Sequence, residues 1–448
     1  MPNRIGMVSL GCPKNQVDAE IMLRRLRDAG YEITGNESEA DVVIVNTCGF
    51  IEDAKKEAID NILELAKLKK EGSLKGLIVT GCLAERYSLE VINEMPEIDA
   101  VLGIGSNNEI VEVVGQVLSG ESKIALFGAK DALDMDSDRI LASPRYTAYL
   151  RIADGCDNCC TYCTIPLIRG RFRSRSMDSI LEEARRLGSR GVRELVVIAQ
   201  DTTRYGEDIY GKPMLPELLN RLCETEGIEW IRVLYAYPDR ITDELLDTMA
   251  SQPKILNYID LPLQHCNGEV LRNMNRRGDR ESLTALIGKI RAKIPDVSIR
   301  TTFITGFPQE TEEQFTELCE FVNEIKFDRL GCFAYSAEEG TKAAQMDGQI
   351  EDSVKARRAE VIMNDQLAIV AEKNKQIIGK TYTVLVEGYD SYIKCCYGRS
   401  YADAPEIDAK VFFTPSSPRP KEGDFVNVEI FDTIEYDLLG QQVENRSE

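Results

Sequence analysis

The first third of the chain alternates short apolar segments with segments of helical periodicity, and this alternation strongly limits the folds open to it. Each apolar segment is followed by a turn and then by a helix-like run: 5–10 by 18–29, 42–45 by 52–70, and 77–80 by 85–94. Strands that alternate with helices at this spacing form parallel sheets. The sequence therefore predicts an N-terminal α/β domain over residues 1–122 with a parallel sheet.

One cysteine follows each of these three predicted strands. Cys12, Cys48 and Cys82 are separated by 36 and 34 residues, and each has a neighbouring glycine. The carboxyl ends of parallel strands meet at one edge of the sheet, where ligands bind, so we expect the three thiols to converge. Convergence would make a metal site, and burial of three cysteines in the core is the alternative.

A second group of cysteines is contiguous. Cys156, Cys160 and Cys163 have the spacing CxxxCxxC in the loop 155–163. Three thiolates can bind three irons of a 4Fe–4S cluster and leave the fourth iron open, as catalytic metal sites do. A zinc site is the alternative, with Cys159 or a distant residue as the fourth ligand. The loop has no histidine, and the adjacency of Cys159 and Cys160 disfavours a shared tetrahedral ion.

The remaining cysteines lack such placement, and we interpret them as packing residues: Cys223, Cys266, Cys319, Cys332, Cys395 and Cys396. An odd total of 13 cysteines in a long acidic chain is not typical of a disulfide scaffold. No apolar run approaches the ~20 residues of a membrane span, and the start of the chain does not resemble a signal peptide. We therefore expect a cytoplasmic protein without membrane contacts.

The middle of the chain predicts six further strand–helix units. After a polar connector at 123–145, the expected strands are 148–153, 194–199, 230–235, 258–261, 297–304 and 329–334. Six such units form an incomplete (βα)6 barrel over residues 146–378, whose active site would lie at the carboxyl ends of the strands. Polar residues follow three of those ends, among them Gln200, Gln264 and Glu310, and could hold a nucleoside cofactor.

Two further features leave their roles open. Arg169, Arg171, Arg173 and Arg175 alternate, so an extended segment would place them on one face. They could bind phosphate, but a role in balancing carboxylates or in structural ion pairs is favoured. His265 is the one histidine of the chain and could be structural or part of the site.

The end of the chain changes pattern. A helix-like run at 354–378 precedes short alternating strands at 382–387, 407–413 and 425–431, which predict a small antiparallel β-barrel over residues 379–448. Residues 381–448 contain 13 acidic and 6 basic side chains, and the whole chain carries a net charge of −21. Nucleic-acid-binding surfaces are basic, so direct nucleic-acid binding is disfavoured and a basic protein or small ligand is favoured.

Taken together, five segments resemble the radical S-adenosylmethionine (SAM) methylthiotransferases of the RimO type: 9–18, 46–50, 156–170, 260–265 and 401–408. The resemblance covers all three domains and implies that the central domain is a radical SAM barrel and the last a TRAM-like barrel that recognises the substrate protein. Such enzymes add a methylthio group to the β-carbon of an aspartate in the small-subunit ribosomal protein numbered twelve. Transfer-RNA adenosine methylthiotransferases are the alternative, but these usually carry Gln-Met-Asn where this chain has Pro13-Lys14-Asn15.

The resemblance also implies cofactors and their ligands. Cys156, Cys160 and Cys163 would hold the 4Fe–4S cluster that cleaves SAM, and Cys12, Cys48 and Cys82 a second 4Fe–4S cluster that presents sulfur. Four residues match SAM-binding positions: Tyr162, Gln200, Gln264 and Glu310. Cys159 is additional to the motif, and Gln309 stands where the family often has glycine.

No catalytic side chain is implied beyond the cluster ligands, and an external electron donor and a sulfur donor would be needed. A protein that binds iron–sulfur or zinc without catalysis is the alternative from a different class.

Overall fold

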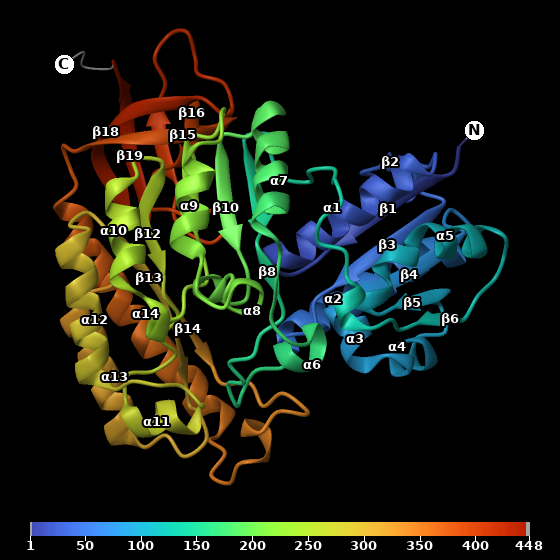
Figure 1. The fold of residues 1–448 in the computed structure, drawn as a ribbon, viewed down its shortest axis with the longest axis horizontal. Coiled ribbons are helices and arrows are strands. Elements are labelled where there is room, and N and C mark those ends of the chain that lie inside the picture. Colours follow the sequence, from blue (N-terminus) through green and yellow to red (C-terminus); the bar gives the residue numbers. More distant parts are fainter. Residues whose placement is uncertain (1, 445–448) are drawn as a thin grey trace.

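A parallel six-stranded sheet forms the N-terminal domain of the computed structural model, which describes residues 2–444 (Figure 1). Met1 and the last four residues of the C-terminal domain expected at 379–448 lie outside the described part. The strand order is β2-β1-β3-β4-β5-β6. The strands are β1 Arg4–Ser9, β2 Glu32–Thr34, β3 Val42–Thr47, β4 Gly76–Gly81, β5 Ala100–Leu102 and β6 Ile124–Leu126.

The two central strands, β3 and β4, are buried along their whole length, as expected for a parallel sheet covered on both faces. The covering helices are α1 Pro13–Asp28, α2 Glu52–Lys70, α3 Cys82–Tyr87, α4 Leu89–Glu94 and α5 Ile110–Leu118, with short 3₁₀ turns η1 Glu37–Glu39 and η2 Ile104–Glu109. The helix predicted at 85–94 is divided into α3 and α4, because Ser88 adopts a left-handed φ of 48°.

The central domain is an open parallel sheet with the order β14-β13-β12-β11-β10-β7. Its strands are β7 Thr147–Arg151, β10 Glu194–Ile198, β11 Trp230–Val233, β12 Ile255–Asp260, β13 Ser298–Thr305 and β14 Arg329–Ala334, and a small ladder joins β8 Ala153–Asp154 to β9 Arg173–Ser174. The six predicted strands are all present, so the incomplete (βα)6 barrel is confirmed.

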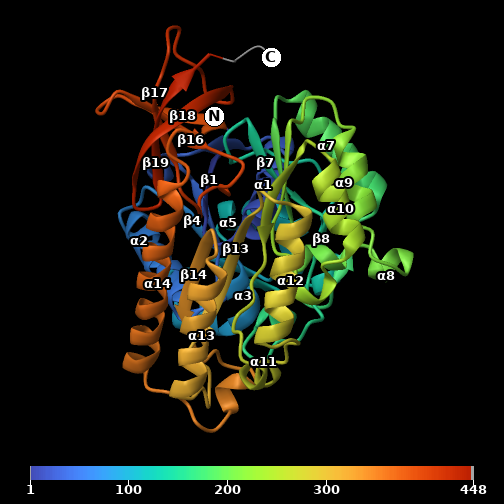
Figure 2. The same ribbon diagram turned by 90° about the vertical axis from the view of Figure 1, so that its left-hand side faces the viewer.

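Helices cover the outer side of this sheet, as Figure 2 shows. They are α7 Met177–Ser189, α9 Leu215–Cys223, α10 Asp243–Ser251, α12 Arg280–Lys293, α13 Glu312–Ile325 and α14 Asp352–Lys375. Shorter helices lie in the loops at the strand ends: α6 Ile165–Arg169, α8 Glu207–Tyr210 and α11 Gly268–Asn273, with 3₁₀ turns η4 Thr202–Arg204, η5 Pro238–Arg240 and η6 Ala343–Gln345.

The inner face of the open sheet is covered by the other two domains. Val196 and Ile198 of β10 point to one apolar cluster, whereas Leu195 and Val197 point to the cluster beneath the helices. The inner cluster also contains Val17 and Ile21 of α1 and, from the C-terminal domain, Leu385 and Ala404. The N-terminal domain is therefore packed into the open side of the barrel.

The C-terminal domain is a closed barrel with the order β15-β16-β17-β19-β18. Its strands are β15 Thr381–Asp390, β16 Cys395–Arg399, β17 Val411–Thr414, β18 Phe425–Ile434 and β19 Asp437–Val443. The sequence did not predict β16 and β19, because glycine, cysteine and glutamine interrupt the apolar–polar alternation there. The strand expected at 407–413 begins only at Val411.

The segment expected to be a connector is more ordered than its composition indicates. Residues 124–126 form β6, which pairs with β5, so the N-terminal sheet continues four residues beyond 122. A 3₁₀ turn, η3 Lys130–Ala132, follows. Among residues 2–444, no helix combines the length and apolar character needed to cross a bilayer.

Candidate metal centre and active site

Three cysteines gather at the carboxyl edge of the N-terminal sheet. Cys12 is the N-cap of α1, Cys48 follows β3, and Cys82 begins α3 directly after β4. The strands β1, β3 and β4 are neighbours, so the three residues lie at adjacent strand ends. A Cβ atom at Gly11 would lie 2.9 Å from the Cys48 sulfur, so the β1–α1 turn is pressed directly against that thiol. The predicted convergence is thus found.

The environment of these thiols disfavours free thiolates. Burial, against the lowering effect of Arg169 and together with the charges on Cys12 and Cys48, raises the pKa of Cys82 to about 12. Burial likewise raises the pKa of the Cys48 thiol. Ile104, Leu133 and Ile168 enclose Cys82 in an apolar cluster. Metal ions deprotonate coordinating thiols outright, so the triad suits a cationic metal group better than a reactive free cysteine.

The contiguous cysteine loop is held by backbone contacts from both sides. Gly155 has a φ of 73°, and a Cβ atom there would lie 2.0 Å from the Arg171 carbonyl oxygen. The Thr161 amide donates to the Met274 carbonyl at 3.1 Å, and the Asn275 side chain donates to the Cys159 carbonyl at 3.0 Å. These contacts fix the loop at the carboxyl ends of the barrel strands.

Within this loop, burial raises the pKa of Cys156 to about 11 and that of Cys163 to about 12. Cys159 is exposed and has a φ of 51°. Between residues 2 and 444, no three Cys, His, Asp or Glu side chains are arranged to hold one metal ion. A cubane takes its three protein thiolates on three separate irons, so each triad has the number and type of ligands that such a cluster uses.

Arg169 connects the two triads. It ends α6, which follows the contiguous loop and contacts α3, the helix that begins with Cys82 (Figure 1). Its buried guanidinium pairs with Asp18 at 2.9 Å and with Asp154 at 3.0 Å, and its Nη2 lies 3.9 Å from the Cys82 sulfur. The contiguous triad and the one assembled by folding therefore lie at neighbouring sheet edges.

The four alternating arginines do not share one face. Arg169 and Arg175 are buried in ion pairs, and Arg173 donates to backbone carbonyls, whereas the Arg171 side chain is 90% exposed. The interpretation as structural ion pairs therefore fits better than a phosphate patch.

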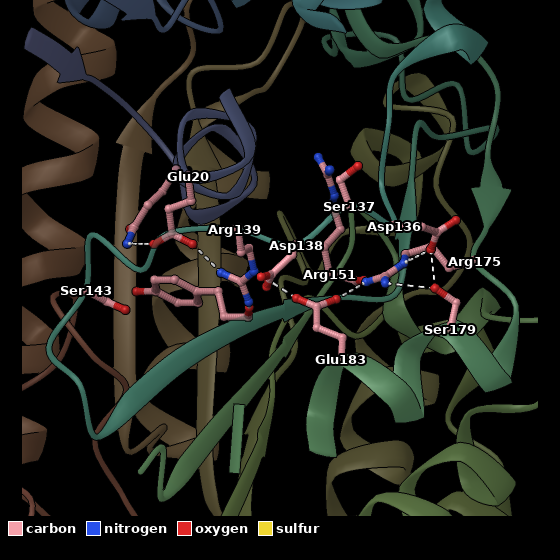
Figure 3. A network of polar contacts seen from close by, with 12 residues as sticks. Glu20, Asp136, Ser137, Asp138, Arg139, Ser143, Arg151, Arg175, Ser179 and Glu183 are labelled. Carbon is pink, nitrogen blue, oxygen red and sulfur yellow. Dashed lines mark hydrogen bonds and ion pairs between the residues drawn. The ribbon is translucent and has the colours of Figure 1, made fainter. Parts of the chain in front are cut away.

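The connector contributes a buried polar network between the domains, shown in Figure 3. Arg139 pairs with Glu20 of α1 and, at 2.8 Å, with Glu183 of α7. Glu183 in turn accepts from Arg175 at 2.6 Å, and Arg175 pairs with Asp136 of the connector at 2.8 Å. In this network, buried charges of the N-terminal domain, the connector and the barrel are paired with opposite charges. These pairs fix the N-terminal domain against the barrel.

Some of the predicted SAM-binding side chains have polar atoms without protein partners. Both amide atoms of Gln200 are buried and make no hydrogen bond, and the same holds for the side-chain oxygen of Gln264. Tyr162 is partly buried beside Cys160, and burial together with the charge on Cys160 raises its pKa well above the usual range. Buried polar groups are normally satisfied, so these orphaned atoms are suited to a polar ligand at the strand ends.

Glu310 is placed differently from these residues. Its carboxylate accepts from the Arg358 guanidinium at 2.6 Å and from the Gly306 amide at 2.9 Å. His265 lies 3.6 Å away and is fully buried; burial, and then Arg358, lower its pKa to about 3, and its Nδ1 accepts from the Asn267 amide. Both residues thus support the loop after β13. Gln309 in that loop has a φ of 70°, a conformation that glycine adopts most easily.

Two charged residues near the triads were not predicted from the sequence. Arg276 stacks on Tyr237 at 4.3 Å and lies 3.8 Å from the Cys160 sulfur. Lys14 is buried beside Cys12, over the ring of Tyr235. The contacts of Arg276 and Lys14 are with residues far away in the sequence, so local patterns do not predict them. The position of Lys14 close to Cys12 was the one available signal.

Comparison with known proteins agrees with this architecture. Residues 4–103 match the uncharacterized protein family UPF0004, residues 150–322 the radical SAM superfamily, and residues 378–443 the TRAM domain. The fold is shared with the radical SAM methyltransferase TsrM from Kitasatospora setae (TM-score 0.56, 13% identity, 74% of this chain and 73% of that one). It is also shared with the cobalamin-dependent radical SAM enzyme OxsB (TM-score 0.51, 14% identity, 81% and 56%).

Fold and cysteine loop together define a radical SAM enzyme, a transferase that uses SAM and an iron–sulfur cluster. The chain is 53% identical over 442 residues to the ribosomal protein uS12 methylthiotransferase RimO of Pelotomaculum thermopropionicum, covering 98% of this chain and 99% of that protein. It is 52% identical over 445 residues to the protein of the same name from Desulforamulus reducens, with the same coverage. The chain belongs to this family of methylthiotransferases.

Proposed function

We propose that this chain adds a methylthio group to the β-carbon of one aspartate in the small-subunit ribosomal protein uS12. The relatives that match nearly the whole chain are named ribosomal protein uS12 methylthiotransferases. The observation that carries the proposal is the position of Arg169, which lies beside Cys82 of one triad and pairs with Asp154, just before the loop that carries the other triad. Joining sulfur to carbon requires a radical source and a sulfur source close together.

Cys156, Cys160 and Cys163 would hold one 4Fe–4S cluster, and Cys12, Cys48 and Cys82 a second. Tyr162, Gln200, Gln264 and Glu310 would surround SAM, Glu310 through the loop it supports. When bound, these groups supply the radical and the sulfur that an unactivated C–H bond needs, since no side-chain base could remove its proton.

The chain itself orients the groups and excludes water. The ion pairs of Arg169 with Asp18 and Asp154 hold the two triads in a fixed relation. The apolar cluster around Cys82 keeps water from that thiol of the second triad. Pre-organisation of this kind lowers the cost of bringing reacting groups together.

The acidic C-terminal barrel, within the proposed domain limits 379–448, would recognise the basic ribosomal protein by complementary charge. The other proposed domains are 1–122 and 146–378, joined by 123–145. An external electron donor and a sulfur donor would serve the enzyme in the cytoplasm, where ribosomal proteins are made.

The test is a paired-substrate assay. The chain is reconstituted with iron and sulfide without oxygen, and then incubated with SAM and a reductant, once with uS12 and once with transfer RNA. We expect mass spectrometry to detect a methylthio gain on uS12 only. A gain on RNA alone would replace the proposal with a transfer-RNA methylthiotransferase. Absence of reductant-dependent deoxyadenosine would indicate a non-catalytic metal protein.

A further inference from the structure

Lys14 is a buried lysine without a carboxylate partner. Its side chain is 7% exposed, and its Nζ lies 3.5 Å from the Ala199 carbonyl oxygen and 3.5 Å from the centroid of the Tyr235 ring. None of the ion pairs formed within residues 2–444 includes Lys14. Burial of an ammonium without a carboxylate is costly, and an aromatic face offsets only part of that cost.

The surrounding carboxylates are already engaged. Beside the Cys12 thiol, whose charge acts on Lys14 most strongly, and Arg169, which opposes it, Asp154 and Asp260 are the carboxylates whose charges act on Lys14. Asp154 pairs with Arg169 at 3.0 Å, and Asp260 pairs with Arg300 at 3.1 Å. Both carboxylates are therefore paired with arginines, and the neighbours left to Lys14 are a carbonyl, a ring and the Cys12 thiol.

Lys14 lies at the junction between the N-terminal domain and the barrel. It lies two residues after Cys12, and its Nζ reaches across to Ala199, which directly follows β10 and precedes Gln200 with its unpartnered amide. A substrate that receives sulfur must lie between the two triads, at this junction of the N-terminal domain and the barrel. An anion on such a substrate would meet the Lys14 ammonium.

We propose that Lys14 is a specificity and positioning residue, whose ammonium pairs with the side-chain carboxylate of the substrate aspartate. The inference rests on the proposed function. The carboxylate carbon is bonded directly to the β-carbon, so an ion pair at Lys14 fixes the carbon that receives sulfur. A neutral nucleobase offers no such anion, and so the same ammonium disfavours it.

A double-mutant cycle tests this pairing. Reconstituted enzyme with SAM but without reductant is titrated with full-length uS12, and with uS12 in which the target aspartate is replaced by asparagine. For the unmodified enzyme we expect asparagine to weaken binding about tenfold, within the range of close charge pairs at interfaces. For Lys14→Met, which preserves the apolar stem over Tyr235, both substrates should bind equally within about twofold. Lys14→Arg should retain most of the discrimination.

Controls distinguish pairing with the substrate carboxylate from a general loss of positive charge and from loss of a cluster. Lys70→Met removes the same charge from a side chain that is 71% exposed and should retain the full discrimination. Iron analysis verifies that each variant has assembled its clusters. An equal asparagine penalty with and without Lys14 would overturn the pairing and assign Lys14 to charge balance near Cys12. The inference would also be overturned if the unmodified enzyme did not distinguish the two substrates.

The paired-substrate assay distinguishes the two levels of failure. If the unmodified enzyme modifies uS12 but the cycle shows no coupling, only the inference about Lys14 fails. If uS12 is not modified, the proposed function fails and the inference fails with it.

Discussion

At the scale of single residues, the site depends on groups whose charge the fold controls. Cys82 is buried and the other five thiols of the two triads are half-buried, and burial raises the pKa of Cys82, Cys156 and Cys163. Near the loop after β13, burial raises the pKa of Glu310 to about 7, although Arg358 lowers it. Substitutions can therefore test the cysteines as cluster ligands and Glu310 as a source of pH-dependent stability.

Cys82→Ser should remove one cluster and spare the other. We expect the iron content to fall from about eight to about four per chain, because serine does not replace a thiolate ligand. Reductant-dependent deoxyadenosine formation should persist, since Cys156, Cys160 and Cys163 are untouched, but methylthio transfer should be lost. The matched control is Cys319→Ser at a half-buried cysteine of α13, which should retain all the iron. Equal iron loss in both variants would contradict the assignment.

Glu310 should make stability depend on pH. Its folded pKa of about 7 exceeds its ordinary value of 4.5, so its protonated form favours the folded state. This contribution is complete below about pH 4.5 and is lost as the pH rises through about 7. The Glu310→Gln variant has no titrating group at this position. The unfolding temperature of the variant minus that of the unmodified protein should therefore increase with pH across this window. Glu312→Gln is the matched control, because Glu312 contacts the same Arg358 from a side chain that is 62% exposed.

At the scale of elements, the turn between β1 and α1 sets the geometry of the folded triad. Gly11 has a φ of 89° there, and its missing side chain leaves the space that Cys48 occupies. Pro13 at the start of α1 suits the first helical turn, so the cysteine between them is held at the helix N-terminus.

Gly11→Ala should therefore impair the second cluster specifically. The added Cβ would lie 2.7 Å from the Cys48 Cβ, so the thiol must move. Gly30→Ala is the control, because Gly30 has a φ of 93° but nothing within 4 Å. Both variants carry a left-handed strain of about 1–2 kcal/mol, but only Gly11→Ala should lose about half of the iron. If Gly30→Ala lost as much iron, strain alone would explain the effect.

At the scale of the whole molecule, three domains share the inner face of the open barrel. Apolar residues of α1, of the barrel strands and of the C-terminal domain form one cluster there. Beside it, Glu194 is fully buried between Arg399 of the C-terminal domain at 2.6 Å and Arg232 at 3.0 Å. Burial raises the pKa of Glu194, but the two guanidiniums lower it to about 2.

Glu194→Gln should loosen the C-terminal domain. Loss of the carboxylate leaves the buried Arg232 without a carboxylate partner and Arg399 with Glu387 alone, which costs about 3–5 kcal/mol. We expect a lower unfolding midpoint and faster release of a fragment near residues 379–444 by limited proteolysis. Glu229→Gln breaks the pair of a 48% exposed carboxylate with Arg193 and should cost less than about 1 kcal/mol. Equal effects of the two substitutions would contradict a docking role for Glu194.

The sequence by itself determined the alternation of strands and helices, the three domains and the placement of cysteines at strand ends. These features follow from local periodicity and from the rule that parallel strands share one carboxyl edge. It missed β16 and β19, where alternation is weak, and short edge strands such as β6.

Only the tertiary structure decided how the charges are paired. Lys14 meets Ala199 and Arg169 meets Asp18, contacts between residues more than 150 positions apart. Local propensity carries no information on such pairs, because they form when α1 packs into the open side of the barrel. The same packing brings the two triads together, and so the chemistry depends on an interface that no single segment encodes.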